Sequence, residues 1–174
     1  MPDGSFRPDG PDSFTPDATR QQDLRAAFGE FATGVTIVTT LQGDKLVGMT
    51  ANSFSSVSLE PPLVMWCPAK SSSRHTAFAA ASHFAVHVLA ADQEALALAF
   101  ARRADAFDTV ETTQTPQGVP LMPGCLARFE CRTHALHPAG DHSIILGEVE
   151  RVTTRPAAPL LFYQSAFRAF DKGL

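Results

Sequence analysis

Apolar and polar residues alternate in short runs along most of this chain, the pattern of half-buried β-strands. It predicts strands over residues 35–40 and 45–49, which the turn signal Gln42-Gly43-Asp44 joins as a hairpin. The same pattern, or a short apolar run between turn signals, predicts further strands at residues 63–67, 84–89, 126–136, 143–154 and 160–163.

Helical spacing of apolar residues is confined to a few segments. Residues 21–31 place Leu24, Phe28 and Phe31 on one stripe, which predicts a short amphipathic helix that packs on the chain that follows. Two more helices are expected at residues 76–81 and 93–104, the second with Asp92 as its N-cap. Because strands outnumber helices and hairpin-length connections are common, we expect a mainly β fold, an antiparallel barrel with a few covering helices.

The length and composition indicate one compact domain. The chain has 174 residues, of which 44% are hydrophobic, enough for a single substantial core over residues 20–174. Residues 1–19 are rich in proline, glycine and aspartate and cannot bury enough surface to offset their ordering entropy. We therefore expect these residues to form a flexible N-terminal arm.

Charge and hydropathy argue against several classes of partner. The formal net charge of -4, with lysine only at positions 45, 70 and 172, gives no basic field for nucleic acid. No apolar run approaches the roughly 20 residues that span a bilayer, and the N-terminus lacks the apolar core of a signal peptide, so no membrane partner and a cytoplasmic location are expected. Cys67, Cys125 and Cys131 show no paired ligand spacing, so we expect reduced thiols and no metal.

Residues 48–62 combine many uncharged hydrogen-bonding side chains between two strand-like segments. Such groups suit a rigid polar ligand that is held by short, directed hydrogen bonds, although surface turns have a similar composition. The candidate side chains in this stretch are Thr50, Asn52, Ser53, Ser55, Ser56 and Ser58.

A second candidate site precedes the predicted helix at residues 76–81. Lys70, Arg74 and three consecutive serines there could bind an anion, or could simply form an exposed, capped helix start. His142 follows Gly140-Asp141 and precedes a predicted strand, which puts its imidazole at a barrel rim, either beside a ligand or in solvent.

Recognised nucleotide and hydrolase motifs are missing from the sequence. It contains no Gly-x-Gly-x-x-Gly, no phosphate loop and no Gly-x-Ser-x-Gly. A nicotinamide nucleotide, if one is used, must therefore bind on the barrel and not in a Rossmann domain.

Several segments together resemble the short-chain flavin reductase family, over about residues 24–170 and in the family's order. They are Phe31-Ala-Thr-Gly-Val-Thr-Ile-Val-Thr-Thr40, Gly48-Met-Thr-Ala-Asn-Ser-Phe54, Ser56-Val-Ser-Leu-Glu-Pro-Pro-Leu-Val64, Gly140-Asp-His142 and Leu146-Gly-Glu-Val149. The resemblance implies a Greek-key split barrel that forms a homodimer. It also implies hydride transfer from NADH or NADPH to FMN or FAD, and delivery of the reduced flavin to a partner monooxygenase.

The resemblance also implies where the ligands bind. The flavin ring and ribityl chain would lie along Met49, Thr50, Ala51, Asn52, Ser53, Ser55 and Ser56. The second segment, which starts at Cys67, would hold the flavin phosphate at Lys70, Ser71, Ser72, Ser73 and Thr76. His142, Tyr163 and Phe167 would contact the nicotinamide nucleotide, although Ser165 and Ala166 depart from the family's usual residues and Phe162, Phe167 and Phe170 could instead close the core.

No general acid, base or nucleophile is expected, because hydride transfer between two stacked rings depends mainly on their positioning. An alternative within the same fold is a flavoprotein that retains its flavin as a carrier, sensor or oxidase. Such a protein would not need His142 or the segment at residues 163–168.

Overall fold

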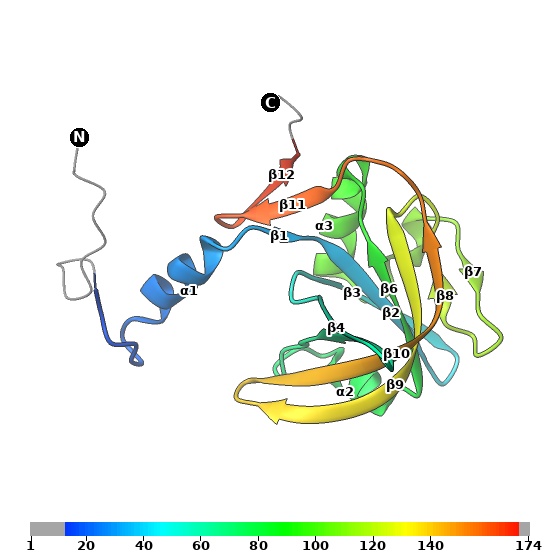
Figure 1. The fold of residues 1–174 in the computed structure, drawn as a ribbon, viewed down its shortest axis with the longest axis horizontal. Coiled ribbons are helices and arrows are strands. Elements are labelled where there is room, and N and C mark those ends of the chain that lie inside the picture. The colour runs from blue at the N-terminus through cyan, green and yellow to red at the C-terminus, as the bar shows by residue number, and fades with distance from the viewer. Residues whose placement is uncertain (1–12, 171–174) are drawn as a thin grey trace.

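The computed structural model describes residues 13–170 and shows a mainly antiparallel β-structure (Figure 1). The helical segments are few and short: α1 (Gln21–Gly29), α2 (His75–Ala80), η1 (Ala91–Gln93), α3 (Glu94–Arg102) and η2 (Ala106–Thr109). Residues 1–12 of the predicted arm lie outside the described residues, and residues 13–19 form neither helix nor strand. The predicted mainly β fold is confirmed.

The largest sheet has seven antiparallel strands in the order β3-β2-β6-β9-β10-β5-β4. Their bounds are β2 (Thr36–Gln42), β3 (Lys45–Ala51), β4 (Ser55–Leu59), β5 (Pro62–Trp66), β6 (His83–Val88), β9 (Ala127–Ala139) and β10 (His142–Thr154). The two edge strands, β3 and β4, are consecutive in the chain and only residues 52–54 join them. The sheet must therefore curl until its edges meet, and we call this junction the seam.

Two smaller sheets complete the β-structure of the described residues. One pairs β1 (Thr33–Gly34), β11 (Leu160–Tyr163) and β12 (Ala166–Ala169), and the other pairs β7 (Thr113–Gln114) with β8 (Pro120–Leu121). The sequence pattern did not indicate β1, β4, β7, β8 or β12. These strands are short or polar and gain their regularity from tertiary pairing.

Two buried clusters pack on the large sheet. One gathers Trp66, Phe78 and Phe84 under α2, and the other includes Phe100 on α3. Gly48 permits the second contact, because a Cβ atom at this position would lie 2.4 Å from the Phe100 ring. Its N–H also donates to the carbonyl of Ala104 at 2.8 Å, so α3 and the segment after it lie against the edge strand β3.

Helix α1 forms where it was predicted but does not pack as predicted. It has no buried residue, and Phe28 and Phe31 are 69% and 78% exposed. Figure 1 shows the helix projecting from the rest of the protein. The expectation that its apolar stripe packs on the following chain is therefore wrong within a single copy of the chain.

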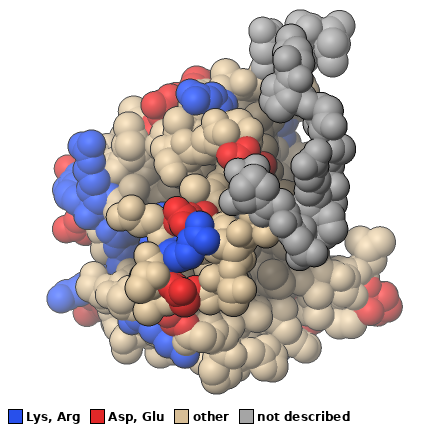
Figure 2. Space-filling view, turned by 90° about the vertical axis from the view of Figure 1, so that its left-hand side faces the viewer, with Lys and Arg blue, Asp and Glu red and all other residues tan. Residues whose placement is uncertain are grey.

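The start of α3 also differs from the prediction. Gln93, not Asp92, is its N-cap, and the side-chain amide of Gln93 bonds the backbone of Ala90 and Pro123. The view in Figure 2 shows acidic and basic side chains intermingled and no extended patch of one sign. Within residues 13–170, no helix combines the length and the apolar character needed to cross a membrane.

Candidate functional site: a cleft at the seam of the sheet

A cleft of about 390 Å³ lies at the seam, and we call it the seam cleft. Its walls come from the end of β3, the connection to β4, the segment after β5 and the start of β10. The residues that line it are Met49, Thr50, Ala51, Asn52, Ser53, Cys67, Ala69 and His142. Apart from Ala69, all of these were predicted to bind cofactor, and the fold brings them from segments distant in sequence into one cleft.

Ser53 fixes the shape of the seam cleft. Its hydroxyl accepts the N–H of Cys67 at 2.9 Å and donates to the carbonyl of Cys67 at 3.3 Å. This pair of bonds ties the β3–β4 connection to the end of β5. Burial raises the pKa of the Cys67 thiol, which keeps it uncharged beside the cleft.

The side chains of Thr50 and Asn52 differ in whether they are available to a ligand. The Thr50 hydroxyl donates to the carbonyl of Ala97 on α3 at 2.6 Å, so it anchors the strand and is not free for a ligand. The Asn52 side chain is exposed and bonds no other residue within 13–170. Gly48 N–H points away from β2, and the alternation of an antiparallel ladder aims the Thr50 backbone N–H the same way, out from the sheet edge.

The opposite wall of the seam cleft consists of residues 68–70 and the start of β10, which are joined by backbone hydrogen bonds. Ala69 forms a β-bridge with His142, Lys70 N–H donates to the carbonyl of Asp141 at 2.8 Å, and Lys70 Nζ donates to the carbonyl of Gly140 at 2.6 Å. These bonds hold His142 at the rim of the cleft.

The orientation of the His142 ring is set by its neighbour. Nδ1 lies 2.8 Å from Asp141 Oδ1, and since a carboxylate only accepts, Nδ1 carries the hydrogen. The bond from His142 lowers the pKa of the Asp141 carboxyl. Nε2 is left for a ligand.

The predicted phosphate segment lies beside the seam cleft. Ser71, Ser73 and Thr76 are exposed, whereas the Ser72 hydroxyl contacts Met49 Sδ at 3.6 Å and accepts the Arg74 N–H. His75 does not reach toward these groups, because its Nε2 lies 2.9 Å from the Ser143 hydroxyl.

An apolar pocket of about 210 Å³ adjoins the seam cleft and shares Thr50, Ala51 and Asn52 with it. Its remaining walls are Val35, Ala101, Phe162 and Phe167. The Phe162 and Phe167 rings pack edge to face with centroids 5.5 Å apart.

Besides the phosphate segment, three further predicted site residues lie outside these two cavities. Ser55 and Ser56 are exposed on β4 and line none of the clefts described. The Tyr163 hydroxyl donates to Glu30 at 2.9 Å, which raises the pKa of Tyr163 and couples the β11–β12 hairpin to the residue after α1. Within residues 13–170, no three His, Cys, Asp or Glu side chains converge as a metal-binding set.

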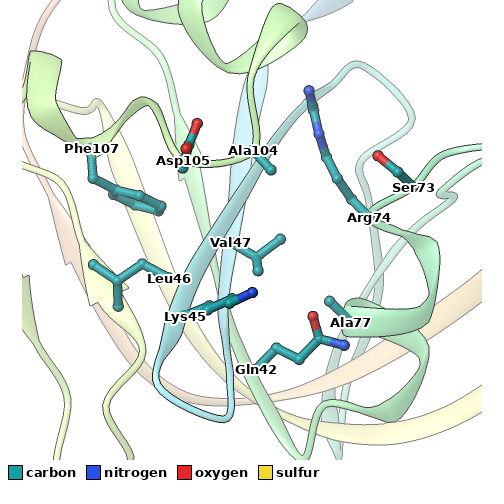
Figure 3. A pocket seen from close by; sticks show the side chains of 10 residues that line it. All are labelled: Gln42, Lys45, Leu46, Val47, Ser73, Arg74, Ala77, Ala104, Asp105 and Phe107. Atoms are coloured by element: carbon teal, nitrogen blue, oxygen red, sulfur yellow. The ribbon is translucent and has the colours of Figure 1, made fainter.

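The sequence pattern did not indicate a further cleft, of about 680 Å³, which we call the hairpin cleft (Figure 3). The β2–β3 hairpin, the start of α2 and the segment after α3 enclose it. Its lining residues are Gln42, Lys45, Leu46, Val47, Ser73, Arg74, Ala77, Ala104, Asp105 and Phe107. The cationic residues Lys45 and Arg74 were the available signal, but they lie on segments that meet only in the fold.

Comparison with known proteins agrees with this geometry. Residues 28–171 match the family described as "Flavin reductase like domain". The chain is 53% identical over 159 residues to the FMN reductase (NADH) SmoA of Agrobacterium fabrum, with 91% of each chain covered. It is 37% identical over 150 residues to the flavin-dependent monooxygenase reductase subunit HsaB of Rhodococcus jostii, covering 85% of this chain and 77% of that protein.

A solved structure is similarly close. The NADH:FAD oxidoreductase SgcE6 of Streptomyces globisporus C-1027, in complex with NAD and FAD fragments, superimposes with a TM-score of 0.85 at 44% identity. The match covers 92% of this chain and 99% of that one. The curled antiparallel sheet is thus the predicted split barrel, and the chain belongs to the flavin reductase-like domain family.

Proposed function

We propose that this protein is an NADH-dependent flavin reductase that reduces free FMN or FAD and releases it to a partner monooxygenase. The observation that carries the proposal is the seam cleft, where uncharged polar groups and His142 converge. The cleft lies next to an apolar pocket that Phe167 helps to line. The activities in the names of its relatives support the same reaction class.

The seam cleft fits a flavin by the chemistry of its walls. Asn52 offers a free amide, and the edge of β3 offers outward backbone groups, so a heterocycle could be bonded along its polar edge without any mobile charge. Ser53 contributes by holding the wall in place, since both of its bonds go to Cys67. Preorganised donors of this kind stabilise negative charge that develops on a bound ring.

The phosphate of the flavin would be held by Lys70 and the exposed hydroxyls of Ser71 and Ser73. One N–H of the Lys70 ammonium group donates to the carbonyl of Gly140, which fixes the position of Nζ. The other two N–H groups remain available to an anion. Ser72 orders the loop by its contact with Met49, and Thr76 extends the polar surface.

His142 and Phe167 would seat the nicotinamide nucleotide. His142 Nε2 can bond a ribose hydroxyl or a carboxamide because Asp141 holds the opposite ring nitrogen. Phe167 lines the apolar pocket that shares Ala51 and Asn52 with the seam cleft, so two planar rings could lie against one another at that boundary.

In this proposal, the protein accelerates the reaction mainly by positioning the two rings. A bound flavin supplies the hydride acceptor, and the protein supplies the fixed polar wall and the pocket that excludes water from one side. No side chain has to abstract a proton from NADH, so the barrier falls chiefly because the two rings are held together.

We further propose that two copies of the chain associate through α1. The stripe of Phe28 and Phe31 is too apolar to leave exposed without a partner, and nothing else within residues 13–170 covers it. A homodimer would bury this stripe against a second copy.

The test is the rate of NADH oxidation as free FMN or FAD is added to the purified protein under anaerobic conditions. A reductase gives a rate that rises with flavin and saturates, and the reduced flavin passes a filter that retains the protein. A protein that holds a stoichiometric yellow cofactor and ignores added flavin would overturn the proposal in favour of a flavin carrier or sensor.

A further inference from the structure

We propose that Glu30, the residue after α1, is a positioning residue for the nicotinamide nucleotide. Its carboxylate holds the turn between β11 and β12 in the conformation that places Phe167 in the wall of the apolar pocket. The inference rests on the proposed function, which seats the nucleotide against Phe167. Glu30 itself lines neither the seam cleft nor the apolar pocket, so it acts through the turn.

The β11–β12 turn has a backbone conformation that its own residues disfavour. Tyr163 pairs with Ala166, so only Gln164 and Ser165 form the turn, with φ of 48° and 60°. Two-residue turns with positive φ at both positions normally use Asn and Gly, which adopt this conformation at low cost. Since neither residue is present, contacts from outside the turn must hold it.

The end of α1 supplies those contacts. Glu30 Oε2 accepts the Tyr163 hydroxyl at 2.9 Å, and Glu30 Oε1 accepts the side-chain amide of Gln164 at 2.9 Å. The carbonyl of Gly29 accepts the backbone N–H of Gln164 at 3.0 Å. Figure 1 shows the turn beside the end of α1. Both the side chain and the backbone of Gln164 are therefore fixed from the same segment.

The charge of Glu30 suits this role. The bonds from Gln164 and Tyr163 lower the pKa of the Glu30 carboxyl, so it is ionised at neutral pH and accepts at both oxygens. Hydrogen bonds to an ionised group are stronger than those between neutral groups. One carboxylate thus holds two neutral donors that flank the start of the turn.

Phe167 depends on the turn because β12 is an edge strand. The sheet order is β1-β11-β12, so β12 pairs only with β11. Phe167 lies opposite Phe162 in this pairing, and the two rings line the apolar pocket together. A short hairpin is marginally stable without further support. If the turn opens, Phe167 loses the register that places its ring in the pocket wall.

The polar wall assigned to the flavin lies on other segments. The seam cleft is lined from β3, the connection to β4, the segment after β5 and the start of β10, and by no residue of β11 or β12. Loss of the Glu30 contacts should therefore weaken binding of the nicotinamide nucleotide and leave binding of the flavin almost unchanged.

The first test is steady-state kinetics of Glu30→Ala. We expect the KM for NADH to rise about fivefold, while kcat and the KM for flavin stay within about twofold of the wild type. Glu30→Gln should stay closer to the wild type, because its amide can still bond Tyr163 and Gln164. Glu111→Ala is the matched control, since it removes an exposed carboxylate that lines neither cavity, and it should change neither constant.

A rescue variant separates positioning from a general loss of structure. Ser165→Gly supplies a residue that adopts positive φ without steric cost. In the Glu30→Ala background it should return the KM for NADH to within about twofold of the wild type. A failure of Ser165→Gly to restore this KM, or an equal rise in the KM for NADH and for flavin in Glu30→Ala, would overturn the proposal.

Amide hydrogen exchange tests the turn with no flavin or nucleotide present. The Gln164 amide, which donates to Gly29, should exchange about fivefold faster in Glu30→Ala than in the wild type. An unchanged exchange rate would overturn the role given to Glu30. Faster exchange in a protein that reduces no flavin would instead overturn the proposed function and leave the contact between Glu30 and the turn in place.

Discussion

Ser53 and Cys67 form a two-point contact in which one hydroxyl both accepts the amide N–H and donates to the carbonyl of the same residue. Residues 14 positions apart are thereby fixed at the seam where the two edges of the sheet meet. The contact explains how a short connection can form one wall of the seam cleft.

Ser53→Ala tests this role. The substitution leaves both Cys67 backbone groups without their partner, so unfolding free energy should fall by about 1–3 kcal/mol, and the KM for flavin should rise. Urea unfolding and steady-state kinetics measure the two effects. Ser82→Ala removes an exposed hydroxyl remote from the cleft and should change stability by less than about 0.5 kcal/mol. Equal effects of the two variants would refute the role given to Ser53.

His142→Ala should raise the KM for NADH about tenfold and the KM for flavin much less, because Nε2 is assigned to the nicotinamide nucleotide. Initial rates at varied NADH and varied flavin separate the two constants. His137→Ala, at an exposed position on β9, is the control. An NADH dependence that stays at the wild-type value would remove His142 from the site.

Acid stability should depend on His87, which is fully buried. Nε2 accepts the Met122 N–H at 3.1 Å and Nδ1–H donates to the Ile37 carbonyl at 3.0 Å, so the neutral ring joins β6 to two other segments. Burial lowers the pKa of His87 to about 4. Between the ordinary histidine pKa and this value, the unfolded chain binds a proton that the folded chain does not.

The free energy of unfolding therefore falls as the pH falls through this window. His87 alone should cost about 2 kcal/mol between about pH 7.5 and about pH 5. Urea unfolding at both pH values measures the loss, and His87→Gln should reduce the pH dependence by that amount while lowering stability at both values. A variant with the wild-type pH dependence would show that another group is responsible.

Phe28→Glu should convert a dimer into a monomer, because it places a charge in the apolar stripe of α1. Light scattering coupled to size exclusion measures the mass. Gln22→Glu adds the same charge to an exposed polar position of the same helix and should leave the dimer intact. A wild-type protein that is monomeric at micromolar concentration would contradict the α1 interface.

Local signals in the sequence predicted the strands that carry the core. The β2–β3 hairpin was predictable because Gly43, with φ of 59°, occupies a turn that favours glycine, and apolar alternation marks the strands on both sides. The seam cleft was predictable only through the family resemblance, since its polar residues have the composition of an ordinary turn.

The parts that escaped prediction depend on tertiary contacts. Strand β4 is rich in serine, a composition typical of loops, and it forms a strand because it pairs with β5. The hairpin cleft is built from three segments, each of which is unremarkable alone. The apolar stripe of α1 predicted a helix correctly but carried no information about which surface would cover it.

The position of a bound flavin is the sharpest test of the proposed reductase site. A crystal structure of the protein with flavin bound should show the isoalloxazine ring in the seam cleft, along the segment from Met49 to Ser53, with His142 at its rim. A ring bound elsewhere, or a seam cleft that closes on its own side chains in the complex, would contradict the account.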